Sequence, residues 1–206
     1  MIRTAFLDAA QSVIDLIASD AVAAKWTSPS ALQGYDVAGL SGHLGRGLGT
    51  PLLYLEESLP STAEPITPGQ YFASVDADDD DLHTAIRARG MKAAAGGQGA
   101  LVAELDRTLE TLRVRLDDEP FDRRVTVFGG QVMYLDEYLV TRLVELVVHG
   151  EDLTISVGTE PPDWPGAAFD LVLATLVEAA AIKHGPSALI TALSRRERLT
   201  VWPSAV

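Results

Sequence analysis

The sequence contains no cysteine. This absence excludes disulfides, thiolate-ligated metal sites and a cysteine nucleophile, so any thiol chemistry must use a sulfur atom from a bound small molecule. Basic residues are also scarce, since 16 lysines and arginines stand against 29 aspartates and glutamates, for a formal net charge of −13. A surface of this sign repels nucleic-acid phosphates and anionic lipids, so we expect neither a nucleic acid nor a membrane as a partner.

Long apolar runs are missing as well. No uncharged apolar stretch reaches the length of about 18 residues that a membrane-spanning helix needs. Residues 1–20 carry Asp8 and Asp15 within their apolar pattern and lack the continuous apolar core of a signal peptide. This pattern is typical of an amphipathic helix, and we expect the protein to be cytoplasmic.

What the chain does have is helical periodicity. Its 206 residues, 47% of them hydrophobic, are enough to bury one sizeable core. Apolar residues recur at helical spacing and predict helices over 2–24, 37–57, 81–94, 100–117, 135–156, 166–184 and 187–197. Residues 123–134 alternate around a Gly-Gly pair and predict a short extended segment. We therefore expect an all-α protein, an antiparallel helical bundle with a short helical C-terminal extension.

The helix predicted over 37–57 is unusual because it contains many glycines, although Asp36 is well placed to cap its first turn. A phosphate-binding loop would end in Gly-Lys-Ser/Thr and follow a strand, and neither feature is present. Small residues on this helix would let another backbone or a ligand come close. The glycines are Gly39, Gly42, Gly45, Gly47 and Gly49.

The connection over 58–81 has the weakest structural signals, because it combines three prolines with the acidic run from Asp78 to Asp81. That run is interpreted as a solvated turn and helix start, since the spaced pattern of a calcium loop is absent. His83 follows it, and His184 precedes a Gly-Pro pair at a helix end. Both histidines are expected to be surface or capping residues.

The helix over 135–156 is the candidate for chemistry. Apolar residues cover roughly 220° of its circumference, about twice the stripe of an ordinary surface helix, which predicts that it is mostly buried. Its narrow polar stripe either faces solvent or lines an internal site. The stripe contains Tyr138, Thr141, Arg142, Glu145, His149 and Asp152.

Glu145 and His149 lie four residues apart, so both side chains point the same way and could share one metal ion. The alternative is a simple surface pair. His43 lies at the edge of the leucine face of its helix, between Gly39 and Gly47, where a histidine is commonly a core residue. If the two helices pack together, two histidines and one glutamate form a three-ligand site with an open position, which is the catalytic rather than the structural zinc pattern.

Three segments resemble a known family. LSGHLGRG around His43 is similar to the L-x-x-H-L-x-R segment of mycothiol-dependent maleylpyruvate isomerase metal-binding domains, and KWTSPSAL…GYDVAGL is similar to the approach to that segment. YLVTRLVELVVHGEDLTISVG resembles the family's R-x-x-E-x-x-x-H-x-x-D-L signature. The resemblance covers residues 1–158. The family's isomerases carry a further C-terminal domain that helps to build the active site, whereas here residues 159–206 follow the signature.

The resemblance implies a DinB-like metal-binding four-helix bundle over 1–158, with residues 159–206 as a helical extension. It further implies that His43, Glu145 and His149 bind a divalent metal, usually zinc, and that mycothiol or a similar low-molecular-weight thiol occupies the open site. The predicted partners are therefore this thiol and a small-molecule substrate, and the predicted assembly is a monomer or a homodimer.

The function predicted on this basis is that of a thiol-dependent metalloenzyme. The metal lowers the pKa of the external thiol, and the thiolate attacks a small electrophilic substrate, giving isomerisation or S-transfer. Arg46 and Arg142 are candidates to bind substrate carboxylates, although Arg142 could instead pair with Glu145. Asp152 could accept a hydrogen bond from the His149 ring or lie at a solvated helix end.

Two other functions remain open. One is a non-catalytic metal-binding bundle that acts in stress response or as a partner module. The other is hydrolysis by a metal-bound hydroxide at the same site. The absence of an H-E-x-x-H motif argues against the protease form of that hydrolysis.

Overall fold

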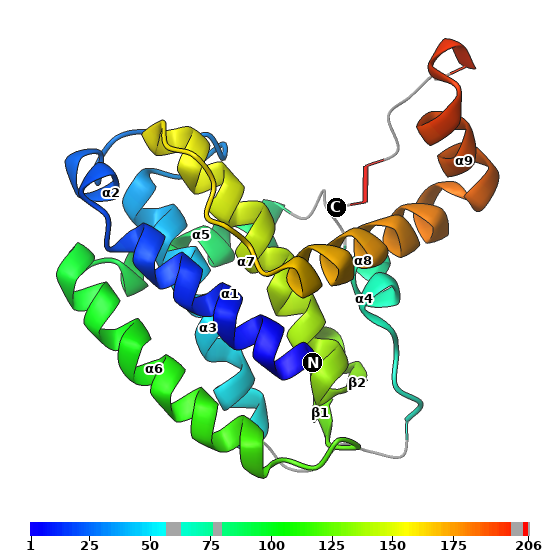
Figure 1. Ribbon diagram of the computed structural model, residues 1–206, viewed down its shortest axis with the longest axis horizontal. Coiled ribbons are helices and arrows are strands. Elements are labelled where there is room, and N and C mark those ends of the chain that lie inside the picture. Colours follow the sequence, from blue (N-terminus) through cyan, green and yellow to red (C-terminus); the bar gives the residue numbers. More distant parts are fainter. Residues whose placement is uncertain (57–62, 76–79, 199–203, 206) are drawn as a thin grey trace.

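The computed structural model describes residues 1–56, 63–75, 80–198 and 204–205 of the chain. The predicted all-α class is confirmed (Figure 1). The helices are α1 (Ile2–Ile17), α2 (Asp20–Ala24), α3 (Val37–Glu56), α4 (Pro68–Ser74), α5 (Asp80–Ala93), α6 (Gln98–Asp118), α7 (Leu135–Val157), α8 (Gly166–His184) and α9 (Pro186–Ser194). None of the described helices is long and apolar enough to cross a membrane.

Four long helices, α1, α3, α6 and α7, pack around one core and form the expected DinB-like bundle (Figure 1). Each of them contacts its two neighbours, so that α1 and α3 lie between α6 and α7. The apolar face predicted for α6 is confirmed, because its five leucines, Leu101, Leu105, Leu109, Leu112 and Leu116, are all buried.

The helix α7 lies at the centre of the molecule and contacts α1, α3, α4 and α8. Its first turn carries Asp136 and Glu137, where the helix dipole favours negative charge. It ends at Gly158, whose φ of 75° is the left-handed conformation that glycine adopts without strain. Leu143 and Leu146 are fully buried, so the prediction of a mostly engulfed helix is confirmed.

A small antiparallel hairpin precedes α7, as the alternating pattern over 123–134 predicts. Strand β1 (Arg124–Thr126) pairs with β2 (Val132–Tyr134), and Arg124 lies opposite Tyr134. The turn between the strands contains Gly129 and Gly130, which have φ values of 78° and 75°. These positive values explain why both positions are glycine.

Two predicted helix boundaries were wrong, and a stretch predicted to have little structure contains a helix. The helix expected over 2–24 is two helices, because the side chain of Ser19 accepts a hydrogen bond from Val22 N and starts α2. The stretch 58–81 contains α4, which tolerates Pro68 at its first position and is capped reciprocally by Thr67 and Gln70. The last helix, α9, ends at Ser194 rather than at 197.

The acidic run falls partly outside the described residues. The chain is described again from residue 80, and α5 begins there, at Asp80. The predicted helix start in this run is therefore present, and the preceding residues of the run are not described.

One glycine of α3, Gly42, and one of α5, Gly90, permit a close crossing of these two helices. A Cβ atom on Gly42 would collide with the carbonyl oxygen of Gly90, and one on Gly90 would lie 2.8 Å from the carbonyl oxygen of Gly39. Gly47 differs, because its nearest neighbour across the helix gap would be Glu145 Cβ at 3.9 Å. The sequence left open whether the small residues of α3 make room for another backbone or for a ligand. Gly42 makes room for the backbone of α5, whereas Gly47 faces Glu145 of the candidate site.

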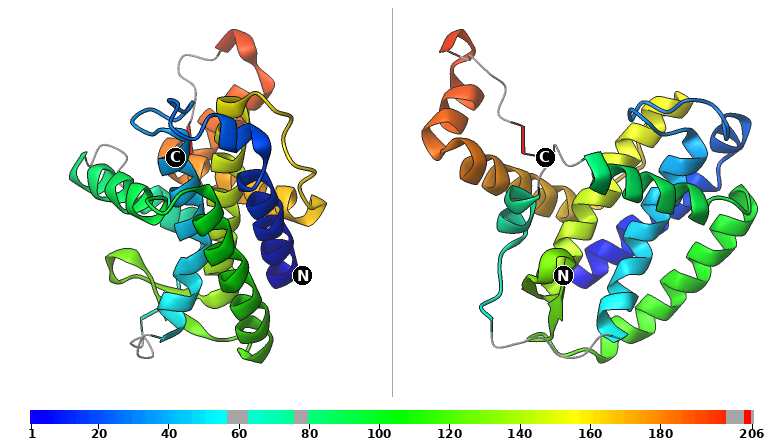
Figure 2. Two further views of the ribbon diagram at one scale, coloured as in Figure 1. Left: turned by 90° about the vertical axis from the view of Figure 1, so that its left-hand side faces the viewer. Right: turned by 180° about the vertical axis from the view of Figure 1, so that it is seen from behind.

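The C-terminal helices leave the bundle at an angle, and α9 projects away from it (Figures 1 and 2). The first of them, α8, packs against α4, α7 and α1. The segment that leads into it is held by Trp164, whose ring lies over Gly150 and whose Nε1 donates to Glu151 Oε1 at 2.8 Å.

Candidate metal centre

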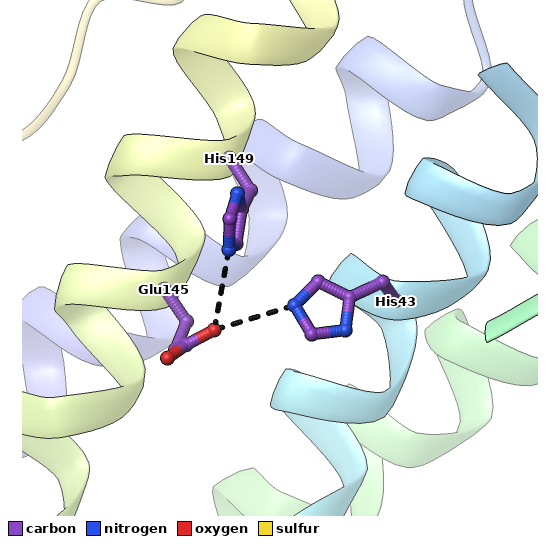
Figure 3. A group of neighbouring side chains, drawn as sticks. All are labelled: His43, Glu145 and His149. Carbon is purple, nitrogen blue, oxygen red and sulfur yellow. Dashed lines mark ion pairs between the residues drawn. The ribbon is translucent and has the colours of Figure 1, made fainter. Parts of the chain in front are cut away.

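The packing of α3 against α7 brings three side chains together, namely His43 from α3 and Glu145 and His149 from α7 (Figure 3). Glu145 Oε2 lies 3.4 Å from His43 Nε2 and 3.5 Å from His149 Nε2. The two imidazole rings meet edge to face, with their centroids 4.8 Å apart. All three side chains are about one-fifth exposed, so the cluster is sheltered but accessible.

This donor set fits a divalent cation of the zinc type. One nitrogen from each histidine and one carboxylate oxygen all lie within 4.8 Å of one another. In a tetrahedral zinc site with ligand bonds near 2.0 Å, adjacent donor atoms are about 3.3 Å apart, close to the two separations that involve Glu145. Three protein ligands leave the fourth tetrahedral position free for an exogenous ligand.

His149 is held from behind by Asp152, whose Oδ2 lies 2.9 Å from His149 Nδ1. A carboxylate at this distance keeps the proton on Nδ1 and turns Nε2 towards Glu145 and His43. Carboxylates arranged in this way orient metal-binding histidines and raise their basicity. Asp152 is therefore engaged by His149 rather than only solvated at the helix end.

The electrostatics of the cluster set its protonation state in the absence of a metal. Burial alone would raise the pKa of Glu145, but hydrogen bonds from His149 and His43 and the charge of Arg142 hold it well below its usual range. Burial lowers the pKa of His149, whereas its bonds to Asp152 and Glu145 raise it to about 9. The metal-free cluster therefore carries an ionised Glu145 and a protonated His149 at neutral pH, and a metal must displace that proton.

A cavity of about 500 Å³ opens beside the three side chains. Both candidate arginines line it, Arg46 from α3 and Arg142 from α7. Arg46 is partly exposed, and burial together with the nearby charge of Arg89 lowers its pKa. Arg142 is only 9% exposed, and no ion pair between it and Glu145 is found among the described residues.

The sequence did not reveal the other side chains of this cavity. His83, expected at the surface, is partly buried and lines the cavity. Tyr35, Tyr54 and Tyr71 also line it, and they come from the segment before α3, from α3 and from α4. No periodic signal unites residues from separate elements, so only the packing of those elements reveals them. His184 lies elsewhere, near the end of α8, with Nε2 2.7 Å from the Ser204 carbonyl oxygen.

Comparison with known proteins agrees with this architecture. Residues 7–154 match the family described as the mycothiol maleylpyruvate isomerase N-terminal domain. A solved structure, the crystal structure of the mycothiol-dependent maleylpyruvate isomerase, superposes with a TM-score of 0.56 at 16% sequence identity. The match covers 88% of this chain and 67% of that chain, and it shows a shared fold. Among curated proteins, none matches this chain.

Proposed function

The chain belongs to the mycothiol maleylpyruvate isomerase N-terminal domain family, and from this membership we propose that it is a thiol-dependent metalloenzyme. It binds a divalent cation, zinc in the first instance, through His43, Glu145 and His149. The observation that carries this proposal is the convergence of these three donors, which join α3 to α7 at ligand-like separations. Residues 1–158 form the metal-binding bundle in this proposal, and residues 159–206 extend it.

When bound, the cation lowers the pKa of a thiol ligand, so that a nucleophilic thiolate is present at neutral pH. The protein's own residues prepare that chemistry. Asp152 orients His149, and the cavity beside the triad admits small molecules. Because the chain has no cysteine, the thiol would be external, mycothiol or a similar thiol. His43, Glu145 and His149 would hold the cation that binds it, and the thiol would supply the nucleophile for isomerisation or S-transfer on a small electrophilic substrate.

Two of the arginines that line the cavity, Arg46 and Arg142, bind carboxylate groups in this proposal. A guanidinium matches a carboxylate with two parallel hydrogen bonds. Arg142 is well suited because its Nε donates to Thr141 Oγ1 at 3.1 Å and no described carboxylate forms an ion pair with it. Arg46 lies on α3, one turn beyond His43, and is available for a second polar group of the substrate or of the thiol.

Metal analysis tests the first step. The purified, zinc-loaded protein is expected to hold about one ion per chain, whereas His43→Ala, Glu145→Ala and His149→Ala each lose it and keep their helical circular dichroism. His184→Ala is the matched control, because His184 lies outside the cluster, and it retains the metal. A zinc-loaded wild type without stoichiometric metal would contradict the proposal and favour a purely structural bundle.

Substitution of zinc by Co²⁺ tests the thiol. A sulfur ligand adds charge-transfer absorption to the Co²⁺ spectrum, so we expect a new band with mycothiol and none with its oxygen analogue. The band fades as the pH falls, because protons compete for the thiolate. A stoichiometric Co²⁺ form that does not respond to saturating thiol would favour hydrolysis or a non-catalytic site instead.

A further inference from the structure

The cavity beside the triad has unusually aromatic walls for this chain. Four of the five tyrosines in the sequence, Tyr35, Tyr54, Tyr71 and Tyr138, line it. Tyr54 and Tyr138 pack edge to face with their ring centroids 5.1 Å apart. Aromatic rings offer flat apolar faces that favour other planar groups at centroid distances of about 4.5–7 Å. The walls therefore suit a ligand with a planar apolar body.

One buried cation lies within these walls. The Cζ atom of Arg142 lies 4.9 Å from the centroid of the Tyr138 ring, and the side chain is buried. Its neighbouring phenols cannot neutralise it, because burial raises the pKa of both Tyr71 and Tyr138. The nearest candidate counter-charge, Glu145, is engaged by His43 and His149.

A buried guanidinium without an anionic partner is costly, and an anion that enters the cavity removes that cost. The acidic exterior of the protein repels anions, so the positive charge of Arg142 acts locally, within the cavity. The cavity is also lined by Arg46, Arg87, Arg89 and Lys183, but each of these is more exposed than Arg142 and therefore better solvated. A ligand with a planar apolar body and one carboxylate satisfies both the rings and the guanidinium.

We propose that this cavity binds an aromatic carboxylate, with the carboxylate on Arg142 and the ring against Tyr54, whose own ring packs on the buried Tyr138. This inference names the class of substrate for the metal centre. The assignment of the ligand as a substrate rests on the function proposed above. The cavity volume of about 500 Å³ lies within the range of about 300–1,000 Å³ that small-molecule sites occupy. It exceeds what a single-ring acid fills, which leaves space for a second reactant.

Calorimetric titration of the metal-loaded full chain with three probes tests the inference. The probes are trans-cinnamate, its neutral amide and maleate, an open-chain dicarboxylate. A hydrogen bond to a charged group is strong enough to give about a tenfold preference or more, so cinnamate is expected to bind at least about tenfold more tightly than the amide. It is also expected to bind more tightly than maleate, which has no ring.

Two arginine variants locate the contact. Arg142→Gln is expected to weaken cinnamate binding by about tenfold or more and to leave the binding of the amide unchanged. Arg124→Gln is the matched control, because Arg124 also stacks on a tyrosine, with its Cζ 5.6 Å from the Tyr134 ring centroid, but does not line the cavity. Its cinnamate affinity is expected to equal that of the wild type.

Three results would overturn the inference. The first is equal binding of cinnamate and its amide, and the second is tighter binding of maleate than of cinnamate. The third is cinnamate binding that Arg142→Gln leaves intact, which would occur if the carboxylate bound the metal alone. If Arg142→Gln does not fold, the wild-type comparison of the three probes decides. The titrations are repeated without metal and compared with the metal analysis and the Co²⁺ spectra. This comparison separates the proposed ligand class from the proposed function. If cinnamate does not bind although the protein holds metal and responds to thiol, only the proposed ligand class is rejected.

Discussion

The properties of His149 are set by the two carboxylates on either side of it. Glu145 is four residues before it and Asp152 three residues after it on the same helix, and both lie within 3.5 Å of a ring nitrogen. Each carboxylate stabilises the imidazolium, which is why the pKa of His149 rises to about 9 although burial alone would lower it. The contacts that orient the ring for a metal also stabilise its protonated form, so a proton competes with the metal for the ring.

We predict that Asp152→Asn lowers the pKa of His149 from about 9 towards the ordinary value of about 6.5. The amide can still accept the hydrogen bond but no longer stabilises the charge. An NMR pH titration of the ring in the metal-free protein measures this shift. As a consequence, zinc binding at pH 7.5 releases fewer protons from the variant than from the wild type, because less of its His149 is protonated. An unchanged titration midpoint would show that Asp152 does not set the basicity of His149.

At the scale of secondary-structure elements, the glycines of α3 divide into positions that face a helix and positions that face open space. Gly42 lies against the backbone of α5 at Gly90, where a side chain has no room. Gly49, two turns later, faces open space, because a Cβ atom added there would meet no atom within 4 Å. The close crossing with α5 places His83 beside the same cavity as His43.

The pair Gly42→Ala and Gly49→Ala is expected to change stability in opposite directions. The methyl group at position 42 collides with the α5 backbone, and such overpacking costs about 1–3 kcal/mol. At position 49 the alanine meets nothing and improves helix propensity by up to about 1 kcal/mol. Urea denaturation of both variants measures the difference. Equal effects of the two substitutions would contradict the close α3–α5 contact.

At the scale of the whole molecule, the proposed metal joins two helices that are distant in sequence. His43 lies on α3, and its partners lie on α7, which also contacts α1, α4 and α8. A ligand that binds only the folded arrangement stabilises every element that α7 supports. Metal binding therefore acts on the global unfolding of the bundle and not only on the local site.

We predict that zinc at about 100 times its dissociation constant raises the free energy of unfolding by about 2.7 kcal/mol. Thermal unfolding with added zinc, compared with unfolding in a chelator, measures this gain as a higher melting temperature. Glu145→Ala is expected to abolish the gain, and His184→Ala to retain it. A melting temperature that rises equally in Glu145→Ala would show that zinc binds elsewhere on the chain.

The sequence by itself determined the features that depend on local periodicity. The spacing of Glu145 and His149 places both on one face of α7 wherever that helix lies, because helix geometry is set by the backbone. The leucine faces predict which sides are buried for the same reason. A helical bundle follows from the number and length of such helices, and the family signatures near His43 and Glu145 imply that it is a four-helix bundle.

Only the tertiary structure decided which distant residues meet. The position of His43 beside Glu145 depends on how α3 packs on α7, and the role of each α3 glycine depends on which helix faces it. No carboxylate in the described part of the chain pairs with Arg142, since Glu145 turns towards two histidines, and the tyrosines around Arg142 come from separate elements. Periodicity describes one element at a time, whereas a cavity is formed by the side chains of several elements after they pack, and no local pattern encodes that arrangement.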